Sequence, residues 1–87
     1  MTTAETAQYL IDIIKVYPNY FGKSDPSASV DLWHEVFESI EYRHAKKALV
    51  EIVQETDFTH PPINELYKRS VQVKRYEYLM RGGVIEG

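Results

Sequence analysis

Residues 57–69 read DFTHPPINELYKR and decide how this chain is organised. Two consecutive prolines separate one run of helical periodicity from a second run that is basic. A residue that precedes proline is disfavoured in helical geometry, so His60 and Pro61 predict a turn over residues 56–61. The stretch fits two structures, the corner of a helical bundle and the turn of a DNA-binding helix pair.

The segment after the prolines predicts a helix over residues 62–80 whose apolar stripe breaks part-way. The stripe of its first half consists of Ile63, Leu66, Tyr67, Ser70 and Val71. Lys74 then falls inside this sector, and later apolar residues, Val73 among them, lie elsewhere around the helix. A helix packed on a small core along its whole length would not show this break. We therefore expect a helical domain over residues 1–71 and a projecting helix with a flexible basic arm over residues 72–87.

Local signals mark three earlier helices. Thr2 and Glu5 have the spacing of a capping box and begin a helix that must stop just before Pro18. Asp25 can cap a second helix that has a proline in its first position. A third helix is expected over residues 42–55. The chain shows no strand-like alternation, so we predict an all-α fold, a small bundle of about four helices with the last projecting beyond the core.

Helical periodicity assigns a core face to each of these three helices. The faces consist of Ala7, Leu10, Ile11, Ile13, Ile14 and Tyr17, then Val30, Leu32, Trp33, Val36, Phe37 and Ile40, then Tyr42, Ala45, Ala48, Leu49, Ile52 and Val53. Asp12 falls on the outward side of the first helix. Trp33 is the largest expected core residue, and the loop residues Tyr17, Tyr20 and Phe21 are expected to cover one end of the core.

Composition limits the class of protein. The chain has 87 residues, enough for one small domain, and no cysteine, so neither disulfides nor thiolate metal ligands are available. No segment approaches the roughly 18 consecutive apolar residues of a membrane span, and the N-terminus lacks the pattern of a signal peptide. We expect a soluble protein that is not exported.

The charges are segregated along the chain, although the formal net charge is only −3. Residues 25–41 hold five acids and no lysine or arginine, whereas residues 68–81 hold five bases and the single acid Glu77. One surface is therefore expected to be negative and another positive. This asymmetry suits a protein partner with complementary patches or a bound nucleic acid.

The sequence contains no motif for catalysis or metal binding. His34 and Glu38 are four residues apart, but HEVFE lacks the second histidine of the zinc-binding HExxH pattern. No glycine-rich loop precedes a helix, and no nucleophile motif is present. We therefore expect neither an enzyme nor a bound metal or cofactor.

The basic fourth helix carries the candidate interaction residues. They combine cations with tyrosines that can anchor a partner or stack on bases. They are Lys68, Arg69, Lys74, Arg75, Tyr76, Tyr78 and Arg81. One alternative is a small DNA-binding regulator that uses the basic helix 62–81, and another is a module that assembles with itself. The long turn and the late position of the bases are atypical of a helix-turn-helix, so weak or no direct DNA binding is expected.

Four short elements follow one another along the chain. They are VYPNYF at 16–21, DLWHEVF at 31–37, KKALVEIV at 46–53 and FTHPPINEL at 58–66. This order resembles the bacteriophage helicase loader/inhibitor family, over roughly residues 5 to 67. Most of these positions are expected in the core or in turns, so the resemblance speaks to fold more firmly than to activity.

The resemblance implies a phage DNA replication protein that binds a hexameric replicative helicase, inhibits it in solution and helps to load it at the origin. It suggests a replisome-organiser protein as a second partner, no membrane, and the cytoplasm of the bacterial host as the location. In the family a flexible C-terminal part contacts the helicase, which corresponds here to residues from about Lys68 to Gly87. A compact family member and a longer protein with further helicase-binding residues both fit this pattern.

Overall fold

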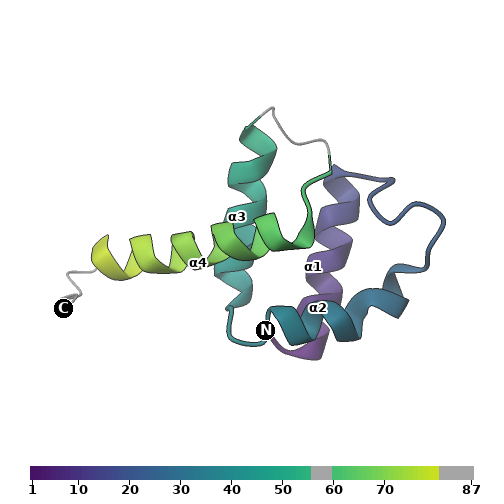
Figure 1. Cartoon of the computed structure of the whole chain (residues 1–87), viewed down its shortest axis with the longest axis horizontal. Coiled ribbons are helices and arrows are strands. Elements are labelled where there is room, and N and C mark those ends of the chain that lie inside the picture. The colour runs from purple at the N-terminus through teal and green to yellow at the C-terminus, as the bar shows by residue number, and fades with distance from the viewer. Residues whose placement is uncertain (56–59, 81–87) are drawn as a thin grey trace.

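The computed structural model describes residues 1–55 and 60–80, which form four α-helices and no strand (Figure 1). The elements are α1 (Thr3–Val16), a 3₁₀ turn η1 (Pro26–Ser29), α2 (Val30–Val36), α3 (Tyr42–Gln54) and α4 (Ile63–Met80). The helices α2 and α3 pack on α1, while α4 crosses α3 and extends past it. The predicted all-α bundle with a projecting last helix is confirmed. Most of the predicted turn, residues 56–59, lies outside the described part.

The local signals form as expected, with one correction. The backbone N–H of Glu5 donates to the Thr2 hydroxyl at 3.1 Å, and the Thr2 N–H donates to the Glu5 carboxylate at 2.8 Å, which completes the capping box. The carboxylate of Asp25 accepts a backbone hydrogen bond at 3.0 Å, as predicted for a cap. However, Pro26 begins a 3₁₀ turn, and regular α-helix begins only at Val30. This first turn is wound more tightly than the sequence indicated, which is common at helix ends.

An aromatic cluster occupies the centre of the core. The rings of Trp33 and Phe37 stack with centroids 5.7 Å apart, and Tyr9 meets the edge of Trp33 at 6.3 Å. The predicted core position of Trp33 is confirmed by its 4 % exposure. The three loop aromatics pack against this core as expected, and the Tyr20 hydroxyl donates to the carbonyl of Pro61. The loop before η1 is thereby tied to the start of α4.

The predicted core face of α1 was wrong at two adjacent positions. Ile11, expected inside, is 48 % exposed, and Asp12, expected outside, is only 5 % exposed. Tyr9 lies in the core instead. The reason is in α3, because Lys46 places its ammonium 3.2 Å from the Asp12 carboxylate and the Tyr42 hydroxyl donates to the same oxygen. These partners make burial of the carboxylate possible.

Three positions on the other helices also differ from the expected faces. Leu32 of α2 and Val53 of α3 were expected inside but are 59 % and 40 % exposed. Val73 was expected away from the core but is buried, because the buried side of α4 runs from Leu66 through Ser70 to Val73. This helix therefore stays in contact with α3 beyond residue 71. The division into a domain and an arm stays a prediction, since the last seven residues lie outside the described part.

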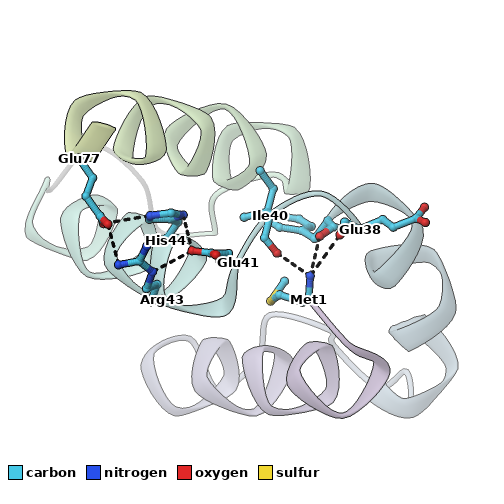
Figure 2. Close-up of polar contacts among 8 residues, drawn as sticks. Met1, Glu38, Ile40, Glu41, Arg43, His44 and Glu77 are labelled. Carbon is cyan, nitrogen blue, oxygen red and sulfur yellow. Dashed lines mark hydrogen bonds and ion pairs between the residues drawn. The ribbon is translucent and has the colours of Figure 1, made fainter. Parts of the chain in front are cut away.

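The ammonium group of Met1 binds the end of α2 (Figure 2). It donates to the carbonyls of Ile40 at 2.5 Å, Phe37 at 3.2 Å and Glu38 at 3.4 Å. Carbonyls at a helix C-terminus lack intrahelical partners and carry partial negative charge, so they favour a cation. The contact joins the start of the chain to the corner between α2 and α3.

Tyr9 carries a buried hydroxyl with no hydrogen-bond partner in the described part of the chain. Burial raises the pKa of this hydroxyl, so it remains protonated at neutral pH. An unsatisfied buried polar group costs about 1–3 kcal/mol, and we expect Tyr9→Phe to increase the free energy of unfolding by about 1 kcal/mol. Urea unfolding followed by Trp33 fluorescence measures this change. A loss of stability would contradict the placement of the hydroxyl.

Candidate functional site

The cations on the first half of α4 are engaged by neighbouring acids. The guanidinium of Arg69 lies 2.6 Å from the carboxylate of Glu55 and 3.4 Å from that of Glu51. Its hydrogen bond lowers the pKa of Glu55, and the same bond raises the pKa of Arg69. Lys68 lies 3.9 Å from Glu65 on its own helix. Arg69 therefore fastens α4 to the end of α3, a structural role that the sequence did not indicate.

The candidate residues on the last turns of α4 are exposed. Tyr76 and Tyr78 are 60 % and 53 % exposed, and Lys74 and Arg75 are exposed beside them. Within residues 1–55 and 60–80, Arg75 makes no ion pair. Arg81, the last candidate, lies outside the described residues. The structure thus leaves charge and aromatic surface available at this end of the helix.

Two apolar residues extend this surface. Leu79 and Met80 are 48 % and 70 % exposed, so four large side chains with apolar surface occupy the last five described positions of α4. Exposed clusters of this kind mark interaction sites more often than scattered single residues do. The sequence separated these residues from the core stripe but did not assign them to the candidate site.

A polar cluster connects the last turns of α4 with the beginning of α3 (Figure 2). The carboxylate of Glu77 lies 2.6 Å from Arg43 Nη1 and 3.0 Å from His44 Nε2. The carboxylate of Glu41 lies 2.8 Å from Arg43 Nε and 3.5 Å from His44 Nδ1, the latter without a hydrogen bond. Arg43 lowers the pKa of Glu41, and Lys74 adds to this effect. We call Glu41, Arg43, His44 and Glu77 the α3–α4 polar cluster.

Glu77→Ala should loosen the last turns of α4 without unfolding the domain. Alanine has the higher helix propensity, so any fraying would come from the lost contacts with Arg43 and His44. We expect amide exchange over residues 74–80 to become about fivefold faster, with global stability changed by less than about 1 kcal/mol. Hydrogen-exchange mass spectrometry measures both. Gln72→Ala, at an exposed position of the same helix, is the matched control, and equal exchange in the two variants would contradict the prediction.

A groove of about 770 Å³ opens between the start of α3 and the last turns of α4. Three candidate residues line it, Lys74, Arg75 and Tyr78, together with Val71 and the α3–α4 polar cluster. The other candidates do not line it. The sequence missed the contribution of α3 to this groove, because no local pattern relates the start of α3 to the end of α4.

The described part of the chain holds no group of three or more metal-ligating side chains. No helix in that part is long and apolar enough to cross a membrane. What the surface at the end of α4 offers chemically is binding, through cations, aromatic side chains and apolar contact.

Comparison with protein families places this fold. Residues 1–67 match the family model for the N-terminal domain of a phage helicase loader/inhibitor protein. The chain belongs to the phage helicase loader/inhibitor family. Neither the curated proteins nor the solved structures contain a significant match. The resemblance inferred from the sequence is thereby confirmed.

The family match covers α1 to α3 and the first turns of α4. The exposed end of α4 lies beyond the matched range, so the match establishes the folded part and says nothing of the candidate residues. Helicase loader/inhibitors are accessory proteins that act on a phage helicase and are not enzymes themselves. The absence of catalytic motifs from the sequence agrees with this class.

Proposed function

We propose that this chain binds a hexameric replicative helicase, inhibits it in solution and helps to load it at the phage origin. Membership of the helicase loader/inhibitor family supplies the class of partner. The observation that carries the proposal is the exposed end of α4, where Arg75 has no ion pair among the described residues and Tyr76 and Tyr78 present half or more of their surface. Tyrosine and arginine are the residue types that most often dominate binding energy at interfaces.

This activity requires no catalytic group. A loader can hold its target inactive only by binding one conformational or nucleotide state better than the others. Release at the origin then requires that DNA and a replisome-organiser protein favour a different state. We place these events in the cytoplasm of the bacterial host.

The structure lends less support to a DNA-binding regulator. Arg69, which the alternative would use for phosphate contact, is held by Glu51 and Glu55. The net charge of −3 also opposes a polyanion. A gel shift at low salt that weakens steeply as salt is added would nevertheless support this alternative over the helicase proposal.

The triple variant Lys74→Ala, Arg75→Ala and Tyr76→Ala should remain folded but lose helicase binding. These side chains lie on exposed helix surface, and alanine preserves the helix. We expect affinity to fall by about 100-fold or more if they include the main anchors. Calorimetric titration into a purified hexameric helicase of the same phage measures affinity, and inhibition of its ATPase provides a second readout.

The exposed Lys47 of α3 supplies the control, because Lys47→Ala removes a charge far from the end of α4 in the sequence. Circular dichroism confirms that each variant is folded. Unchanged affinity in the triple variant would refute the assignment of these residues.

A further inference from the structure

The last turns of α4 present two different faces. One faces α3 and continues the buried side of the helix from Val73 to Glu77. The other consists of Val71, Lys74, Arg75 and Tyr78, which line the groove. Their spacing of i, i+3, i+4 and i+7 puts them in one stripe along the helix. This stripe begins with a residue packed against the core and ends with an exposed tyrosine.

The opposite wall of the groove is fixed by internal ion pairs. Arg43 is within 2.8 Å of both Glu41 and Glu77, and the buried His44 lies between the same two carboxylates. These contacts hold the beginning of α3 against α4, so the groove exists before any partner arrives. A preformed site loses less conformational entropy on binding than one that must first be ordered.

The charges of the groove are unevenly used. Glu41 and Glu77 are neutralised by Arg43 within the α3–α4 polar cluster, and Lys74 interacts with Glu41 only at longer range. Arg75 makes no ion pair in the described part of the chain. The charge that remains available to a partner is therefore positive, and it flanks the apolar surface of Val71 and Tyr78.

We propose that this groove receives an acidic amphipathic helix of the helicase. The proposal rests on the proposed function and adds the location and chemistry of the contact. The apolar side of the incoming helix would lie on Val71 and Tyr78, and its carboxylates would pair with Arg75 and Lys74. Recognition of a helix in a groove through anchors spaced by one helical turn is a recurrent mode of protein recognition.

The groove between α1 and α3 fits this occupant less well. It is smaller, about 360 Å³, and the ammonium of Lys46 on its rim is already engaged by Asp12 at 3.2 Å. Its exposed aliphatic residues, such as Val50, offer no aromatic anchor. This second groove therefore serves as the comparison surface in the experiment.

The first test is charge reversal. The double variant Lys74→Glu and Arg75→Glu, in the full chain, should weaken binding to the purified phage helicase by about tenfold or more, because acidic residues would meet the carboxylates of the partner. The control Lys23→Glu and Lys47→Glu makes the same change in net charge at two exposed positions outside the groove. Its affinity should stay within about twofold, apart from a small general effect that added salt removes.

The second test identifies the occupant. A photoreactive phenylalanine analogue in place of Tyr78 should crosslink to the helicase, and mass spectrometry should locate the crosslink on an acidic amphipathic helix. The same analogue in place of Val50 should give no crosslink. A crosslink from Val50 alone, or one from Tyr78 to a basic segment, would overturn the proposal.

The two levels of inference fail differently. If the unmodified chain does not bind the helicase, the proposed function is wrong and the groove proposal falls with it. If the unmodified chain binds while both double variants bind equally well, the groove proposal alone is overturned. A larger loss with Tyr76→Ala than with Tyr78→Ala would also overturn it, because Tyr76 does not line the groove.

Discussion

Replacement of Phe37 by alanine should remove most of the stability of this domain. The Phe37 side chain is fully buried, and its ring lies 5.5 Å from that of Tyr9, 5.7 Å from Trp33 and 5.9 Å from Tyr67. Truncating a buried phenylalanine costs about 3–5 kcal/mol, because apolar contact is lost and a cavity remains. A chain of this length is stabilised by only about 4–13 kcal/mol in total. Urea unfolding followed by circular dichroism measures the loss.

Leu32→Ala is the matched control for this prediction. Leu32 and Phe37 were both expected on the core face, but Leu32 is 59 % exposed. We therefore expect Leu32→Ala to change the free energy of unfolding by less than about 0.5 kcal/mol. Comparable losses in the two variants would show that α2 is oriented differently from the structure described above.

Asp12→Asn should destabilise the protein at neutral pH and much less in acid. The buried Asp12 carboxylate accepts hydrogen bonds from the Tyr42 hydroxyl and, at 3.1 Å, from the Gln8 amide, and it lies 3.2 Å from the Lys46 ammonium. Burial alone would raise the pKa of Asp12, but these partners outweigh it and lower the pKa from 3.8. Loss of the charge should cost about 1–3 kcal/mol at pH 7.

The pH dependence follows from the direction of this shift. A carboxyl group with a lowered pKa in the folded state contributes stability that is fully present above the unfolded pKa, near 3.8, and is lost as the pH falls through the folded value. The difference between wild type and Asp12→Asn should therefore shrink below pH 3.8. Asp31→Asn, at an exposed position, should show no such difference. A pH-independent gap between wild type and Asp12→Asn would contradict this account.

Much of the fold was predictable because its signals are local. The capping box of Thr2 and Glu5, the cap at Asp25 and the prolines that bound the helices act within a few residues. The broken stripe of the fourth helix correctly indicated that its end projects from the bundle. The candidate residues also came from one continuous helix, and for this reason a single sequence could nominate them.

The orientation of the helices was less predictable. Periodicity identifies an apolar side but not which boundary residues a neighbouring helix will cover, so Ile11 and Leu32 were placed inside and Val73 outside. Arg69 was nominated for a partner without any sign that Glu51 and Glu55 would bind it. These errors share one cause, since each depends on a contact with another helix.

The sequence by itself therefore determined the helical class, the positions of most helix ends, the family resemblance and the basic end of α4. Only the tertiary structure decided that Asp12 is buried and that Arg69 is a structural contact. It alone brought Glu41, Arg43 and His44 opposite the end of α4 to form a groove. The physical reason is range: propensity, capping and periodicity act within a few residues, whereas the burial of a charge is decided by the partners that distant segments bring to it.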